Sequence, residues 1–295
     1  MLRSRYLQLD VFALRCGGGN PLGVVLDAEH WSTTQMQDFA AWTGLVETTF
    51  VLPATEISAD YRVRIFTPER EIAFAGHPTI GSAHAVLESR RIVELDRPLV
   101  QQCQAGLLPI RVNEAGGRRR LLVRAPAARV LRVGVDGRLS RLLEGIQLGS
   151  LPPAFLDGGR RWWVVEFARE TDLRAWRPDH AAIAELARES ESLGLCIFAR
   201  GQGRHELIVR AFPAGVGITE DPASGAANGL IAAWIAGREP EGSLAHGYHV
   251  SQGREIGHDA EIDVRIEQGE IWVGGAVHTI IAGSVDWPPQ ERNCA

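Results

Sequence analysis

Apolar and polar positions alternate along many short segments of the chain, which predicts a protein built mainly of β-strands. β-Branched and aromatic residues with a two-residue period are typical of strands with one buried face. In the first half the pattern predicts strands at residues 6–14, 24–26, 48–52, 61–66, 92–95, 107–112 and 121–124. In the second half it predicts strands at 161–168, 195–199 and 206–212, and a hairpin of 262–266 with 270–273.

Helices are few, and their ends mark them. Ser32-Thr33-Thr34-Gln35 is a capping box, which predicts a helix that runs to Thr43 and ends at Gly44. The other predicted helices span residues 80–90, 178–189 and 223–236. The pattern therefore predicts a β-rich α+β protein in two halves.

The two halves share a motif. In the first half, Arg-x-Phe at residues 64–66 leads through a loop to His-Pro-Thr-Ile-Gly-Ser-Ala at 77–83 and a helix. In the second half, Arg-x-Phe at 210–212 leads to Asp-Pro-Ala-Ser-Gly-Ala-Ala at 221–227 and a helix. Strand, loop and helix follow in the same order, so we interpret the match as an internal repeat.

The repeated loop has the composition of an anion-binding helix start. Pro is tolerated at the first helical turn, and the open N–H groups of a helix N-terminus bind anions. The sequence alignment places His77 and Asp221 at the same position, each beside such a start. Two facing helix ends would hold a carboxylated small molecule between two domains. For either end alone, an ordinary cap is the alternative.

Three ionisable residues are candidates for chemistry. Glu47 stands directly before an apolar strand, where partial burial would raise its pKa toward an acid/base role. An exposed edge glutamate is the alternative. His77 is a candidate proton carrier, or a hydrogen-bonded loop histidine. Asp221 either caps its helix or orients His77.

Composition excludes several classes of function. All 31 basic residues are arginines, so no lysine Schiff base and no phosphate loop ending in Gly-Lys-Ser/Thr can form. The net charge of −5 gives no basic footprint for nucleic acid, and the apolar runs fall short of the roughly 18 residues that a membrane span needs. No Cys-x-x-Cys pair occurs, which favours free thiols in a reducing cytoplasm for Cys16, Cys103, Cys196 and Cys294.

Metal and hydrolase chemistry find little support. His246 and His249 are close in sequence, but no third ligand has metal-site spacing, so no metal is expected. Ser224 lacks the Gly-x-Ser-x-Gly turn of a nucleophilic serine. A hydrolase that uses Ser224, His77 and Asp221 remains a minor alternative.

Five motifs follow one another along the chain: Gly19-Asn20-Pro21-Leu22-Gly23-Val24-Val25, Glu47-Thr48-Thr49-Phe50-Val51, Arg64-Ile65-Phe66-Thr67-Pro68, Ala75-Gly76-His77-Pro78-Thr79-Ile80-Gly81 and Glu220-Asp221-Pro222-Ala223-Ser224-Gly225. In this order they resemble the phenazine biosynthesis PhzF-like isomerase family, and the resemblance covers nearly the whole chain. The resemblance implies a diaminopimelate-epimerase-like fold. Such a fold has two similar domains, each a mixed β-sheet wrapped around a central α-helix, with the active site in the interdomain cleft.

The resemblance also implies domain limits and an activity. We expect an N-terminal domain at 1–125, completed by 276–290, and a C-terminal domain at 126–275. The family's members are usually cofactor-free homodimers, and the best-known activity isomerises a dihydro-hydroxyanthranilate by a proton shift. The acid/base there matches Glu47, and residues matching His77 and Asp221 line the pocket.

Two differences from related proteins change what we expect of the site. Related epimerases use two thiols, one from each half, but none of the four cysteines lies at the repeat positions. The family often has Ser two residues after the position of Ser224, where this chain has Ala226. A substrate contact is therefore expected to differ.

We predict a cytoplasmic, cofactor-independent isomerase that moves a proton within a small carboxylated metabolite. Glu47, His77 and Asp221 are the predicted catalytic residues. The alternatives are a thiol-free epimerase or hydrolase in the same cleft, or a non-catalytic small-molecule-binding protein. The predicted substrate-binding residues are Asn20, Gly76, Gly81, Ser82, Ser224, Gly225 and Ala226.

Overall fold

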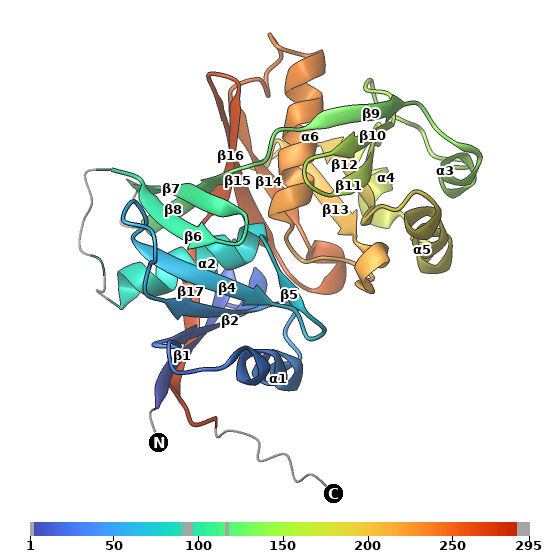
Figure 1. The fold of residues 1–295 in the computed structure, drawn as a ribbon. Helices are drawn as coiled ribbons and strands as arrows, with labels where there is room; N and C mark the ends of the chain where they lie inside the picture. The colour runs from blue at the N-terminus through green and yellow to red at the C-terminus, as the bar shows by residue number, and fades with distance from the viewer. Residues whose placement is uncertain (1–2, 90–91, 93–96, 116–117, 288–295) are drawn as a thin grey trace, which may run out of the picture. The chain divides into compact units, whose positions relative to one another are not determined.

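The computed structural model describes residues 3–89, 92, 97–115 and 118–287 (Figure 1). Its internal contacts divide the chain into two compact units. The first comprises Met1–Cys16, Asn20–Val123 and Gly275–Ala295, and the second comprises Gly17–Gly19 and Arg124–Gly274. Within the described residues, no helix is both long and apolar enough to cross a membrane.

The first unit is a mixed sheet with two helices, α1 (Thr33–Thr43) and α2 (Gly76–Glu88). Its strands pair in the order β17-β1-β2-β3-β4-β6-β7-β8. The pairs β2–β3 and β4–β6 are parallel and the other neighbours are antiparallel, and β5 pairs with β4. The strands are β1 (Ser4–Val11), β2 (Asn20–Leu26), β3 (Thr48–Leu52), β4 (Tyr61–Phe66), β5 (Glu71–Ile72), β6 (Leu99–Cys103), β7 (Gly106–Ala115), β8 (Arg118–Arg124) and β17 (Val277–Val285).

The second unit has a sheet in the order β9-β10-β11-β12-β13-β14-β15-β16, with β11–β12 and β13–β14 parallel. The strands are β9 (Arg129–Val133), β10 (Ala154–Asp157), β11 (Arg161–Glu166), β12 (Gly194–Arg200), β13 (Leu207–Phe212), β14 (Gly247–Gln252), β15 (Ala260–Glu267) and β16 (Glu270–Gly275). The helices are α3 (Gly137–Leu142), α4 (Glu170–Ala175), α5 (His180–Glu189) and α6 (Gly225–Arg238), with 3-10 turns at Ala214–Val216 and Arg254–Ile256.

The two sheets repeat one plan. From β1 to β8, and from β10 to β16, parallel and antiparallel pairings follow in the same order, and an antiparallel edge strand (β17 or β9) precedes each series. A mostly buried helix lies against each sheet: α2 contacts β1, β2, β3, β6 and β17, and α6 contacts β11 and β15. The predicted α+β fold of two similar domains, each a mixed sheet around a central helix, is confirmed.

Local sequence signals explain several element ends. Ser32 Oγ accepts from the Gln35 N–H at 3.2 Å, and Gln35 Oε1 accepts from the Ser32 N–H at 2.9 Å, so the capping box is formed. Helix α1 then ends before Gly44, whose φ of 65° suits a residue without a Cβ. The predicted strands 48–52 and 61–66 agree with β3 and β4, and the predicted hairpin is β15–β16.

Other predicted boundaries are wrong. Helix α2 begins at Gly76 rather than at residue 80, because Pro78 fits into a first turn that needs no N–H from it. Helix α6 begins at Gly225 rather than at residue 223, because Ser224 is its cap. Of the predicted strand 92–95, only Ile92 lies within the described residues, and it is in a bend. Patterning missed the strands β5, β6, β9, β10, β14 and β17 and the short helices α3 and α4.

The structure also changes the alignment inside the repeated motif. Asp221 forms a bridge with Ala211, and its N–H donates to the Ala211 carbonyl at 2.9 Å. In the first unit Ile72 pairs antiparallel with Ile65. Ala211 and Ile65 are the middle residues of the two Arg-x-Phe motifs, so Asp221 corresponds to Ile72. The alignment of Asp221 with His77 is therefore wrong by five residues.

The helix starts support the corrected alignment. Helices α2 and α6 both begin four residues after the paired position, so His77 corresponds to Ala226. The sequence comparison failed because Pro-x-x-Gly occurs on different sides of the two helix starts. Pro78 lies inside α2, whereas Pro222 precedes α6.

Candidate active site

Glu47 and His77 come together in the first unit. Glu47 directly precedes β3, and His77 is the second residue of α2. The His77 Nε2 atom lies 3.3 Å from Glu47 Oε2, and the two side chains are only 8% and 13% exposed. The structure thus joins two of the three predicted catalytic residues in one partly buried pair.

Burial controls the charge of the His77 ring. It lowers the pKa of His77 to about 3, because an imidazolium in a buried position loses its hydration. The ring is therefore neutral at physiological pH and carries one N–H donor and one acceptor nitrogen. Its Nε2 atom can donate to a Glu47 carboxylate or accept from a Glu47 carboxylic acid. The pair can gain or lose one proton without placing a buried positive charge on the histidine.

The backbone around Glu47 is closely packed. The Gly23 N–H donates to the Glu47 carbonyl at 3.5 Å, and the Thr43 and Thr48 hydroxyls lie 3.1 Å apart. A Cβ at Gly23 would lie 3.0 Å from Leu45 Cδ1. These contacts fix the point at which the chain enters β3, and so the origin of the Glu47 side chain.

The start of α2 offers backbone N–H groups. Ala75, which has no side-chain acceptor, precedes the helix, and the first helical N–H groups have no acceptor within the helix. The Gly76 and His77 N–H groups belong to this set, whereas Pro78 has none to offer. Gly76 therefore lies where the predicted anion contact requires it.

Three other predicted binding residues of the first unit have internal contacts. A Cβ at Gly81 would come within 2.3 Å of Leu22 Cδ2, so close packing of α2 accounts for this glycine. Ser82 is fully buried and donates to Thr49 Oγ1 at 2.9 Å. Asn20 is buried at the start of β2. Their roles toward a ligand stay predictions.

Asp221 is in the second unit and does not cap α6. Its Oδ1 accepts from the Ala223 N–H at 3.1 Å, and its carbonyl accepts from Gln252 Nε2 at 2.8 Å. The cap is Ser224, whose hydroxyl accepts from the Ala227 N–H at 3.3 Å. Gly225 and Ala226 form the first turn, and Ala226 is exposed.

Sequence reasoning missed the polar residues that hold the two helix starts. Asn228 Nδ2 donates to the carbonyl of the capping Ser224 at 2.8 Å and to Gln252 Oε1 at 2.9 Å. At the corresponding place in α2, Thr79 donates to the Ala75 carbonyl at 2.9 Å and accepts from a buried glutamine, Gln101, at 3.2 Å. A glutamine in the strand after each helix was the available signal.

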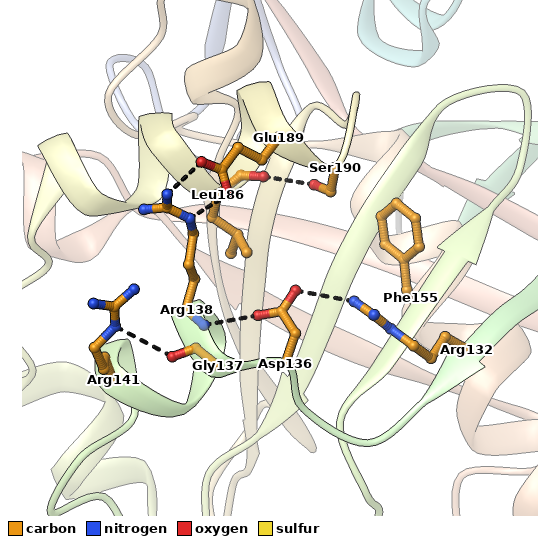
Figure 2. A pocket seen from close by; sticks show the side chains of 9 residues that line it. All are labelled: Arg132, Asp136, Gly137, Arg138, Arg141, Phe155, Leu186, Glu189 and Ser190. Atoms are coloured by element: carbon orange, nitrogen blue, oxygen red, sulfur yellow. Dashed lines mark hydrogen bonds and ion pairs between the residues drawn. The ribbon is translucent and has the colours of Figure 1, made fainter.

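A cavity of about 600 Å³ lies wholly within the second unit (Figure 2). Arg138 forms ion pairs with Glu185 and Glu189, and Arg132 Nη2 lies 3.0 Å from Asp136 Oδ2. These charges already neutralise one another, and no predicted site residue lines the cavity. We interpret the cavity as a structural feature of the region where ion pairs join α3 to α5, and not as a ligand site. Its lining residues are Arg132, Asp136, Gly137, Arg138, Arg141, Phe155, Leu186, Glu189 and Ser190.

Comparison with known proteins identifies relatives over most of the chain. A family model described as phenazine biosynthesis-like protein (PhzC-PhzF) matches residues 9–283. Antisense-enhancing sequence 1 of Schizosaccharomyces pombe is 32% identical over 96% of this chain and 99% of its own length. The trans-2,3-dihydro-3-hydroxyanthranilate isomerase of Pseudomonas aeruginosa is 31% identical over 89% of this chain and 90% of its own length.

A solved structure supports the same relationship. The PhzF-family phenazine biosynthesis protein of Bacillus anthracis superimposes with a TM-score of 0.84 at 26% identity, and the match covers 97% of this chain and 100% of that one. Several curated relatives carry the name isomerase. The chain is therefore an isomerase-type enzyme and belongs to the phenazine biosynthesis-like (PhzC-PhzF) protein family.

Proposed function

We propose that the protein is a cofactor-independent isomerase that moves a proton within a small carboxylated, unsaturated or cyclic substrate. The observation that carries this proposal is the buried pair of Glu47 and His77, with 3.3 Å between Oε2 and Nε2. A carboxylate held beside a neutral imidazole in a site of low exposure is a suitable acid/base group.

The proton follows a closed path. The Glu47 carboxylate takes a proton from a carbon next to an activating group, and the electron pair of the C–H bond shifts into the substrate. Glu47 then returns the proton to a different carbon, so that the enzyme ends in its starting state. The His77 ring stays neutral throughout, and its Nε2–H can donate to the Glu47 carboxylate before the first transfer and again after the proton has been returned.

The second unit lacks a counterpart to Glu47. Thr48 lies opposite Phe66 in the first unit, and Leu195 lies opposite Phe212 in the second, so Thr48 and Leu195 correspond. The residues directly before them, Glu47 and Gly194, therefore correspond as well. Gly194 has a φ of 142°, and a Cβ there would lie 2.1 Å from the Phe212 carbonyl oxygen. No acid or base side chain can occupy this position without rebuilding the strand.

This asymmetry favours chemistry by one base. Racemisation with two bases needs a proton carrier from each side of the reacting carbon. Here Glu47 and His77 of the first unit correspond to Gly194 and Ala226 of the second, and neither counterpart can carry a proton. The arrangement supports a proton shift in which one carboxylate both removes and returns the proton.

Binding roles follow from the helix starts. We propose that the N–H groups of Gly76, Gly225 and Ala226 bind the substrate carboxylate or stabilise enolate-like charge. Asp221 is proposed to hold a polar group of the substrate or relay a proton between polar groups, without acting on the reacting carbon. The isomerase from Pseudomonas aeruginosa, whose name specifies a hydroxyanthranilate, supports a cyclic carboxylated substrate.

The proposal includes a homodimer and a cytoplasmic location. The family resemblance supports the homodimer, and the free thiols of Cys16, Cys103 and Cys196 support the cytoplasmic location.

A panel of small carboxylated metabolites tests the function. Turnover is followed by absorbance or NMR for the wild type, Glu47→Gln and Glu56→Gln, an exposed matched control. We expect turnover of at least one unsaturated or cyclic acid, a loss of about 10²–10⁴-fold in Glu47→Gln, and no loss in the control. Binding without turnover across the panel would show a binding protein, and full activity of Glu47→Gln would refute the mechanism.

A further inference from the structure

A buried hydroxyl pair joins the two elements that carry Glu47 and His77. The Ser82 Oγ donates to Thr49 Oγ1 at 2.9 Å, and both residues are fully buried. Thr49 lies two residues after Glu47 at the start of β3, and Ser82 lies on α2 shortly after His77. This bond is a direct polar connection between the helix and the strand.

The hydrogen-bond chain continues into the sheet. Thr49 Oγ1 donates to the Gly23 carbonyl at 3.4 Å, and the Gly23 N–H donates to the Glu47 carbonyl. Ser82, Thr49 and Gly23 therefore form a connected path that ends on the backbone of Glu47. The Ser82 and Thr49 hydroxyls each have one O–H group, and both O–H groups donate to acceptors inside the protein. Ser82 therefore has no O–H left to donate to a substrate.

The second unit shows that the fold itself does not need these hydroxyls. Thr49 lies opposite Ile65 as Cys196 lies opposite Ala211, so Thr49 corresponds to Cys196. Ser82 holds the same place after the start of its helix as Ile231, and both Cys196 and Ile231 are fully buried. The repeat thus uses apolar side chains at these positions in the unit whose corresponding residues, Gly194 and Ala226, form no Glu–His pair.

We propose that Ser82 and Thr49 are positioning residues, whose hydrogen bond sets the distance between His77 Nε2 and Glu47 Oε2. This inference rests on the proposed function of Glu47. At 3.3 Å the two atoms are in contact without the alignment of a hydrogen bond, so a small movement of α2 relative to β3 changes whether they can form one. The assignment replaces the expected substrate contact of Ser82.

A mutant cycle tests the inference. In Ser82→Ala, Thr49→Val and the double variant, we expect kcat to fall by about tenfold to a hundredfold with KM within twofold, since small misplacement of reacting groups slows the chemical step. The double variant should be no slower than the slower single variant. Thr49→Ser keeps a hydroxyl and should restore most of kcat.

A matched control removes a different hydroxyl contact. The Ser190 and Ser192 hydroxyls lie 2.8 Å apart in the second unit. Ser192→Ala should leave kcat and KM unchanged. An increase in KM for Ser82→Ala with kcat unchanged would show a substrate contact and overturn the positioning role, as would unchanged kinetics.

A readout that needs no substrate separates this inference from the proposed function. In ¹⁵N-labelled protein, the His77 Nε2 resonance should shift in Ser82→Ala and in Thr49→Val, and should keep its wild-type position in Ser192→Ala. If Glu47→Gln stays active while these shifts occur, the proposed function fails and the positioning role stands. If the resonance does not move, the positioning role fails.

Discussion

Individual side chains in this protein owe their properties to burial. His77 is the clearest case, since loss of hydration lowers its pKa to about 3 and keeps the ring neutral beside Glu47. A neutral ring has one N–H donor and one acceptor nitrogen, so it can donate to a carboxylate or accept from a carboxylic acid. An imidazolium has no acceptor nitrogen and can only donate. The same residue therefore links the stability of the fold to pH.

His77 predicts a loss of stability in acid. Its pKa is lower in the folded state than the ordinary value of about 6.5 in the unfolded chain, so the unfolded state binds more protons between these values. The free energy of unfolding should fall as the pH drops through this window, by at most about 1.4 kcal/mol per pH unit from this residue.

Urea unfolding between pH 7 and pH 4 checks this slope. His77→Asn should flatten it, whereas His180→Asn, at an exposed position, should leave it as in the wild type. An unchanged slope in His77→Asn would show that the histidine does not bury as a neutral ring.

Gly81 predicts a packing defect. Its Cβ would lie 2.3 Å from Leu22 Cδ2 and 3.0 Å from Val11 Cγ2, so Gly81→Ala should lower the free energy of unfolding by about 1–3 kcal/mol. Gly237→Ala, where a Cβ meets nothing within 4 Å, should be neutral or stabilising. Denaturant unfolding of both variants gives the comparison. Unaltered stability with a raised KM in Gly81→Ala would instead favour a ligand contact.

At the level of elements, the Arg-x-Phe motifs gain a physical role. Arg210 Nε and Nη2 donate to the two oxygens of Glu220 at 2.9 Å, and Arg210 Nη1 donates to the carbonyls at the end of α4. Arg64 binds Glu71 through the same two nitrogens, at 2.8 and 2.6 Å. Each pair ties its strand to the segment that leads into the central helix.

The two pairs should differ in their effect on stability. Arg210 and Glu220 are each 4% exposed, so Arg210→Met strands a buried carboxylate and should cost about 3–5 kcal/mol. The double variant Arg210→Met/Glu220→Leu should recover most of that loss. Arg64→Met should cost less, because water reaches that pair. Thermal or urea unfolding of the four proteins measures these costs. A double variant as unstable as Arg210→Met would contradict the argument.

The elements also show what the sequence could predict. Caps and alternation locate α1, β3 and β4 closely, because these signals are local. The five-residue error in the repeat arose because similar letters lie on both sides of the two helix starts, and only the pairing of Asp221 with Ala211 reveals this. The Ser82 contact was equally beyond reach, since the sequence does not show whether a helical serine faces a ligand or the core.

At the scale of the whole molecule, the two units share one fold but carry different side chains at the positions of Glu47 and His77. Both units repeat the sheet order and the central helix, but the positions that carry Glu47 and His77 in the first hold Gly194 and Ala226 in the second. The family resemblance pointed to Glu47 and His77, and the structure brings them together. The corrected repeat adds that their counterparts, Gly194 and Ala226, cannot move a proton. This asymmetry supports the proposed proton shift by one carboxylate.

The most direct test follows the moved proton. When a substrate from the panel is converted in heavy water, deuterium should enter the product only at the newly protonated carbon, on the face from which the original proton left. It should enter in those turnovers in which the Glu47 carboxylic acid exchanges with the solvent before it returns its proton. Glu47→Gln should slow both conversion and deuterium incorporation by about 10²–10⁴-fold, while Glu56→Gln keeps both. Inversion at the starting carbon, or full incorporation in Glu47→Gln, would contradict a proton shift carried by Glu47 alone.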